Sequence, residues 1–240
     1  MSKMNQLKIL DAKCWSPLWD DYLKESTVFD PLKVREITCI VPIPDRSEVL
    51  VFSDEGIFLS ARTALATLRQ FSFAHCFPDY GILSSVLKDI DSFGKYKFPW
   101  ACPYFALCPL EGGNQGVWIN PLKIENIYKL DGLHYARLLN GMKLIVPISR
   151  YYALLRAEVA CGILAAIRQD TYHFSVLGNN PSEYVYLPNT AFAHSLAKRP
   201  LLKNFVTRKY EMHRRYQRAR FLHYFEQLET NPQDLRWENW

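Results

Sequence analysis

The chain has 240 residues, a formal net charge of +5 and a charged fraction of 22%. A chain of this length can bury a sizeable core, either as one large domain or as one domain with an appendage. Its longest apolar run, Val159 to Ile167, is far shorter than the roughly 20 residues needed to span a bilayer. The N-terminus is polar and does not fit a secretory signal. We therefore expect a cytoplasmic protein without a membrane partner.

The N-terminal half reads as strands interrupted by helices. Pro17 opens a short helix, and Asp30-Pro31 marks a break after it. Ser60 is the predicted N-cap of a helix over Ala61 to Phe73, and Ile82 to Ile90 is a helix or, alternatively, a strand. The predicted strands of this half are Val34 to Ile43, Val49 to Phe52 and Gly56 to Leu59, with a turn at Asp54-Glu55-Gly56 before the last.

The segment from Gly116 to Ala165 gives the clearest structural prediction. Asn140-Gly141 fits a two-residue type I′ turn, in which both central residues need positive φ. Ser149 is the predicted N-cap of a helix that runs from Arg150 through Ile167. The strands expected before that helix are Gly116 to Asn120, Lys123 to Leu130, Leu133 to Leu139 and Met142 to Ile148.

The positive charge is concentrated near the C-terminus. Residues 198–220 contain nine Lys or Arg and one acid, Glu211, so this window carries +8 and the rest of the chain −3. Pro200 suits the first turn of a long helix from Leu201 to Glu229, stopped by Asn231-Pro232. One side of that helix would carry Leu202, Phe205, Met212, Tyr216 and Ala219, and the other Lys203, Arg208, Arg214, Arg215 and Arg218. The basic side indicates either phosphate contacts or a solvated or protein-binding face.

Signs of catalytic or metal chemistry are few. The six cysteines form no Cys-x-x-Cys pair, and most have apolar neighbours, which favours reduced and mostly buried thiols. Cys102 and Cys108 have no histidine at metal-ligand spacing. His75-Cys76 are adjacent in sequence, which does not by itself make a nucleophile and base pair. The sequence also has no His-Glu-x-x-His, Gly-x-Ser-x-Gly or Rossmann glycine motif. We expect neither an enzyme nor a cofactor or metal.

A series of short blocks resembles a known family. The blocks are Ile37 to Pro42, Ala64 to Phe77, Pro103 to Pro109, Trp118-Ile119-Asn120, Leu139-Asn140-Gly141 and Pro147-Ile148-Ser149. Their order and spacing resemble the ComK family of competence transcription factors over Arg35 to Ala165. The stretch from Ile119-Asn120 to Ser149-Arg150 also resembles a LytTR DNA-binding domain, where a strand, an NG-type turn and a Ser-Arg lead into a final helix.

Together with these patterns, the sequence predicts an α+β fold with a β-rich core, an Asn-Gly hairpin followed by a helix, and a long basic C-terminal helix. We divide the chain into an N-terminal segment (1–34), a ComK-like core (35–168), a connecting segment (169–199) and a basic helical extension (200–240). By the same resemblance, the protein would bind double-stranded DNA at paired A/T-rich promoter boxes as an oligomer and activate competence and DNA-uptake genes. RNA polymerase and a proteolytic adaptor would be further partners.

The resemblance also suggests DNA-binding residues. Arg150 matches a basic LytTR residue that reaches into a DNA groove, and a guanidinium there can read guanine or an A-tract minor groove. The alternative is a surface arginine that satisfies the helix end. Lys95 and Lys97 fall where ComK has a basic loop. The remaining candidates are Lys123, Lys143 and Arg156 on the same surface as Arg150, and Arg208, Arg214, Arg215 and Arg218 on the C-terminal helix.

Two functions remain open from the sequence. The first is a sequence-selective DNA-binding transcriptional regulator. The second is an adaptor or inhibitor that does not bind DNA and docks its basic helix on an acidic protein.

Overall fold

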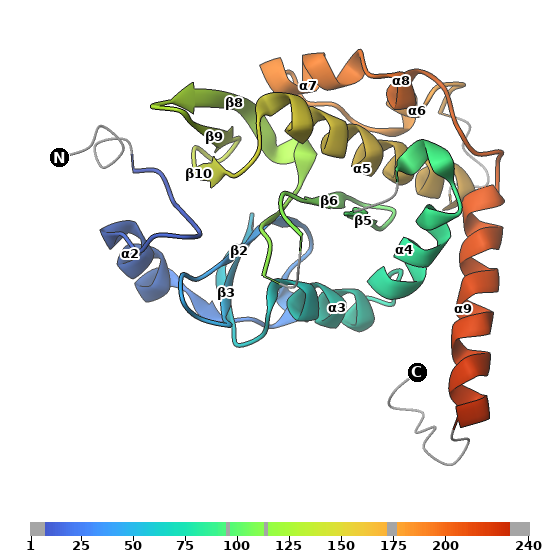
Figure 1. Cartoon of the computed structure of the whole chain (residues 1–240), viewed down its shortest axis with the longest axis horizontal. Helices are drawn as coiled ribbons and strands as arrows, with labels where there is room; N and C mark the ends of the chain where they lie inside the picture. Colours follow the sequence, from blue (N-terminus) through green and yellow to red (C-terminus); the bar gives the residue numbers. More distant parts are fainter. Residues whose placement is uncertain (1–7, 95–96, 113–114, 172–176, 231–240) are drawn as a thin grey trace.

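The computed structural model describes residues 8–94, 97–112, 115–171 and 177–230, with side chains up to residue 226. The fold is α+β, with a seven-stranded sheet, a three-stranded sheet and helices packed around them. Figure 1 shows the long helix α5 (Arg150–Thr171) crossing the molecule, with the small sheet near its N-terminus and α9 (Glu211–Thr230) beside its C-terminus.

The larger sheet forms the centre of the N-terminal half. Its strand order is β1-β4-β3-β2-β7-β6-β5, and every neighbouring pair is antiparallel except β1 with β4. The continuous apolar runs of β2 and β3 are buried along almost their whole length, as central strands require. The strands are β1 (Thr27–Val28), β2 (Ile37–Pro42), β3 (Val49–Ser53), β4 (Gly56–Ser60), β5 (Trp100–Ala101), β6 (Ala106–Pro109) and β7 (Trp118–Ile119).

The smaller sheet is a meander of β8 (Ile124–Leu130), β9 (Leu133–Leu138) and β10 (Lys143–Val146). Ile124 and Ile127 are both buried although they are three residues apart, because a register shift interrupts β8 between Ile124 and Asn126. Leu10 forms a parallel bridge to Leu144 and so extends the β10 edge of this sheet. The predicted strands of both sheets are therefore present, most of them shortened by a few residues at their ends.

The predicted type I′ turn at Asn140-Gly141 is wrong. Gly141 has φ +84°, but Asn140 is not among the residues with positive φ, and the Gly141 N–H donates to Leu138 O at 2.9 Å. The connection is a three-residue loop with glycine in the left-handed position. The two-residue turn with positive φ at both positions lies one hairpin earlier, where Asp131 (φ +48°) and Gly132 (φ +84°) join β8 to β9.

Helices cover the sheets on several sides. Ser60 does not cap the first of the core helices; its hydroxyl pairs instead with Thr67 Oγ1 at 2.7 Å, and Thr63 is the N-cap. The segment from Ile82 to Ile90, for which the sequence allows a helix or a strand, is mostly helical. The helix begins earlier than expected, at Tyr80, and Asp79 Oδ1 accepts the Ile82 N–H at its start. The helices of this half are α2 (Pro17–Glu25), α3 (Ala64–Ala74) and α4 (Tyr80–Lys88), with short 3-10 turns at η1 (Pro31–Lys33), η2 (Asp91–Phe93) and η3 (Pro121–Lys123).

The helix α5 is buried along much of its length and contacts both β-strands and the C-terminal helices. It starts at Arg150 as predicted, and the Ser149 carbonyl accepts the Ala153 N–H at 3.0 Å. Glu158 lies almost completely buried on this helix, where it accepts hydrogen bonds from Arg199 Nε at 2.6 Å and Leu201 N–H at 2.9 Å. This carboxylate fixes the C-terminal segment to the core.

The C-terminal part is not one long helix from Leu201 to Glu229. It consists of α6 (Pro181–Tyr184), α7 (Ala191–Ala197), α8 (Pro200–Lys203) and α9. The chain leaves helical geometry after Lys203, and Tyr210 has φ +65° directly before α9. The helix α7 falls within the predicted connecting segment and was not anticipated. Within the described part of the chain, no helix combines the length and apolarity needed to cross a bilayer.

All six cysteines are free thiols, and Cys39, Cys102, Cys108 and Cys161 are buried, in agreement with the expectation of mostly buried thiols. Cys14 and Cys76 are exposed.

Candidate nucleic-acid interface

The position of α9 is set by a carboxylate on another helix. Asp170, in the last turn of α5, is only 4% exposed. Its Oδ2 accepts the His213 N–H at 2.8 Å, and its Oδ1 accepts the Tyr210 N–H. These N–H groups lie at the start of α9, where backbone donors have no partner within the helix. Burial raises the pKa of Asp170 despite these hydrogen bonds, so the charged form is held at a cost.

One side of α9 packs against the core. Met212 is buried, and Tyr216, one turn later, accepts the Asp79 N–H on its phenol oxygen at 2.9 Å. That bond ties α9 to the first turn of α4. The predicted apolar stripe is therefore correct for Met212, Tyr216 and Ala219, which face the core from α9. Leu202 and Phe205 also pack inward, but from the separate segment before it.

The opposite side of α9 faces solvent and carries arginines. Arg214 and Arg218 are exposed, and Arg208, just before the helix, is exposed as well. Arg215 differs from them because its guanidinium binds Glu211 Oε1 at 2.8 Å. The Arg208 N–H and the Arg215 guanidinium together hold the pKa of Glu211 below its usual range. The one acid of this region is therefore already neutralised, and the other arginines keep a net positive face.

The sequence prediction left further exposed basic residues of this region unassigned. Lys209 stands with its ammonium 5.1 Å from the ring centroid of Tyr210, and Arg220 lies 5.7 Å from that of Tyr224. Both were visible in the basic window and could have been named from it. Past the arginines, the outer face of α9 turns apolar: Phe221 and Phe225 are exposed and stack with centroids 6.0 Å apart.

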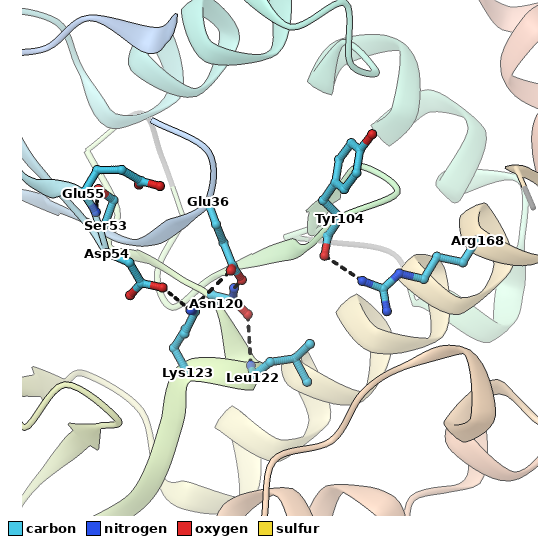
Figure 2. A network of polar contacts seen from close by, with 9 residues as sticks. All are labelled: Glu36, Ser53, Asp54, Glu55, Tyr104, Asn120, Leu122, Lys123 and Arg168. Carbon is cyan, nitrogen blue, oxygen red and sulfur yellow. Dashed lines mark hydrogen bonds and ion pairs between the residues drawn. The ribbon is translucent and has the colours of Figure 1, made fainter. Parts of the chain in front are cut away.

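The candidate DNA-binding residues outside the C-terminal region form contacts within the protein, and Lys123 is the first of them. Figure 2 shows Lys123 held between two carboxylates, with its Nζ 2.8 Å from Asp54 Oδ2 and 3.2 Å from Glu36 Oε2. Burial lowers the pKa of Lys123, but the hydrogen bond to Asp54 and the charge of Glu36 outweigh it, so the net pKa is raised. Asn120 completes the cluster, since its Nδ2 donates to Glu36 Oε1 at 2.8 Å. Lys123 thus links η3 to the residue before β2 and to the turn between β3 and β4.

Arg150 is similarly occupied in this conformation. Its Nη2 donates to Ser195 Oγ at 2.8 Å and to Ala191 O at 3.4 Å, both on α7, and its Nε reaches Asn126 Oδ1 at 3.5 Å. The guanidinium therefore joins the start of α5 to α7 and the small sheet. These partners lie on other elements and not at the end of α5 itself.

Arg156 is half-buried and donates to Pro109 O, and burial lowers its pKa. Lys143 lies on β10, where its carbonyl accepts the Leu10 N–H, and its side chain is partly buried. Lys97 is exposed, whereas Lys95 lies outside the described residues. The structure thus brings the exposed predicted arginines together at α9 and not around Arg150.

Arg168 is an internal arginine that sequence reasoning did not identify. Its guanidinium donates to the carbonyls of Pro103, Tyr104 and Tyr184 at 2.7–2.8 Å, as Figure 2 shows for Tyr104. Nothing in the local sequence distinguishes this arginine from those on α9.

Comparisons of the chain with protein-family models, curated proteins and solved structures find no match.

Proposed function

We propose that this protein is a double-stranded DNA-binding transcriptional regulator that contacts phosphates through the outer face of α9. The observation that supports this most is the set of exposed guanidinium groups of Arg208, Arg214 and Arg218, beside an acid that Arg215 already neutralises. Positive groups that track one face of a helix attract the phosphate backbone and release its counterions. Such contacts position a protein on DNA but do not read its sequence.

Selectivity for A/T-rich promoter boxes is the second part of the proposal and rests on the ComK-like order of blocks. On that basis the protein acts in the cytoplasm as an oligomer that activates competence genes, with RNA polymerase and a proteolytic adaptor as partners. Arg150 is the proposed reading residue. To enter a groove, its guanidinium would exchange the bonds to Ser195 and Ala191 for contacts with DNA. Lys123, Lys143 and Arg156 contribute at most secondary contacts in this proposal.

Fluorescence anisotropy with purified protein tests the proposal. An A/T-box duplex should bind more tightly than a G/C-matched duplex of the same length at physiological salt. Equal affinity for the two duplexes would remove the selectivity, and no binding to either would remove the function.

A second candidate function is that of a non-DNA-binding adaptor or inhibitor. It is favoured by Phe221, Leu222 and Phe225, which are large apolar side chains exposed on the same helix. Exposed apolar groups next to arginines are typical of protein interfaces. Replacing Phe221 and Phe225 with serine should leave DNA affinity unchanged if α9 acts only on phosphates, and should abolish partner capture if α9 docks on a protein.

A further inference from the structure

A groove lies between α9 and the helices α3 and α4, on the side of α9 that faces away from Arg214 and Arg218. Figure 1 shows α9 standing along the edge formed by α4 and α3. The groove has a volume of about 720 Å³, which lies within the range of small-molecule sites, roughly 300–1,000 Å³. The Asp79 N–H donates to the Tyr216 phenol oxygen, and this hydrogen bond joins α9 to the start of α4 along one wall of the groove.

Two arginines enter this groove from opposite walls. Arg69 comes from α3, and its Nη2 lies against Gly81 in the first turn of α4. Arg220 comes from α9, one turn after Tyr216. Within the described part of the chain, neither guanidinium forms an ion pair. Two guanidinium groups without a carboxylate partner in a recess favour an anion, and their planar geometry suits a phosphate or carboxylate.

The carboxylates that line the groove are already in use. Asp79 caps α4 by accepting the Ile82 N–H, and Asp170 holds the start of α9. Aromatic side chains form part of the remaining lining: Phe73 is 60% exposed, and Phe77 and Tyr224 border the same space. The groove therefore offers cationic groups beside apolar ring faces.

We propose that this groove binds a small organic anion with an aromatic body, such as an aryl phosphate. The anionic group lies between Arg69 and Arg220, and the ring packs against Phe73 and Tyr224. Because the ligand touches α3 and α9 at once, its binding also stabilises the docking of α9 on the core. This site is separate from the outer face of α9 and does not depend on DNA binding.

Cys76 provides a direct probe because it is exposed and lines the groove. Cys14 is the second exposed thiol, lies outside the groove and serves as an internal control. Burial raises the pKa of the other thiols, to about 11 for Cys102 and about 12 for Cys108, so they compete little for an alkylating reagent.

The experiment measures the rate of iodoacetamide modification of each cysteine by peptide mass spectrometry, with 1-naphthyl phosphate as the ligand. Saturating ligand should slow modification of Cys76 several-fold and leave Cys14 unchanged. Inorganic phosphate and 1-naphthol, which each carry half of the chemistry, should protect much less at equal concentration. The same preference should appear in calorimetric titrations of the unmodified protein.

Variants complete the test. Arg69→Ala and Arg220→Ala should each raise the concentration of 1-naphthyl phosphate needed for half protection by about tenfold, the effect of losing one charge-assisted contact. Arg62→Ala is the matched control, because Arg62 is exposed just before the start of α3 and does not line the groove. The proposal is overturned if Cys76 is not protected, if 1-naphthol protects equally well, or if both groove variants bind like the control.

Discussion

Asp170→Ala removes the group that joins the end of α5 to the start of α9. In the structure this carboxylate accepts the N–H groups of Tyr210 and His213 on its two oxygens. Losing a helix cap costs about 1 kcal/mol, and leaving a partly buried N–H without a partner adds about 1–3 kcal/mol. The removal of a carboxylate that is expensive to bury offsets part of this loss, since burial raises the pKa of Asp170. We therefore expect a decrease of about 2 kcal/mol in the free energy of unfolding.

Denaturant titration and thermal denaturation measure the loss of stability, and hydrogen exchange measures the loosening of α9. A loss of about 2 kcal/mol should lower the melting temperature of a chain of this size by about 4–8 °C. Amides of the first turns of α9 should lose more protection than those of β2 and β3. Asp21→Ala, which removes an exposed aspartate from α2, should change stability by less than about 0.5 kcal/mol. Unchanged exchange in α9 of the Asp170 variant would refute this account of how α9 is held.

Three further predictions concern the same framework. Gly141→Val should destabilise the fold by about 1 kcal/mol or more, because a β-branched residue is strained at φ +84°. An added Cβ would meet no neighbour there, so the cost comes from the backbone alone; an unchanged denaturant midpoint would contradict this. Glu158→Ala should lower the free energy of unfolding by about 2–3 kcal/mol, since it leaves the partly exposed Arg199 and the Leu201 N–H without their acceptor, while Glu158→Gln should cost less in the same titration. The raised pKa of Asp170 means that its protonation favours the folded state: this stabilising contribution is full below the unfolded pKa and is lost as pH rises through the folded one. The stability of the wild type relative to Asp170→Asn should therefore increase as pH falls through that window, and a constant difference would contradict the assignment.

Much of the fold follows from local sequence patterns. The apolar runs of β2 and β3 and the turn residues between them predict the strands, because burial of a central strand demands such runs. The hairpin turns show where local reasoning fails. Asp131-Gly132 and Asn140-Gly141 are similar pairs, yet only the first adopts two positive φ values. The strand register decides how many residues each loop contains, and register depends on contacts across the sheet.

The candidate site was predictable only in part. The basic window marks α9 because consecutive turns of one helix carry its arginines. The engagement of Lys123 depends on Glu36 and Asp54, which are distant in sequence and approach it only in the folded sheet. Arg150 likewise meets Ser195 through the packing of α7 on α5, and α7 itself was not expected. The non-helical residues before α9 were not predicted either. The N–H groups at the start of α9 are satisfied by Asp170, which lies on α5 and is distant in sequence.

The central proposal is that the outer face of α9 contacts DNA phosphates, and a salt series of anisotropy titrations tests it most directly. Arg214→Ala combined with Arg218→Ala removes two exposed guanidinium groups without touching the core. Lys24→Ala combined with Lys129→Ala is the control, because these exposed lysines lie on α2 and β8, at the end of the molecule opposite α9 (Figure 1). The α9 variant should bind every duplex more weakly, and its plot of log affinity against log salt should be shallower by about 2 units, at about 0.9 per phosphate contact. The control should match the wild type. Equal affinity and slope in the α9 variant and the wild type would contradict the proposal.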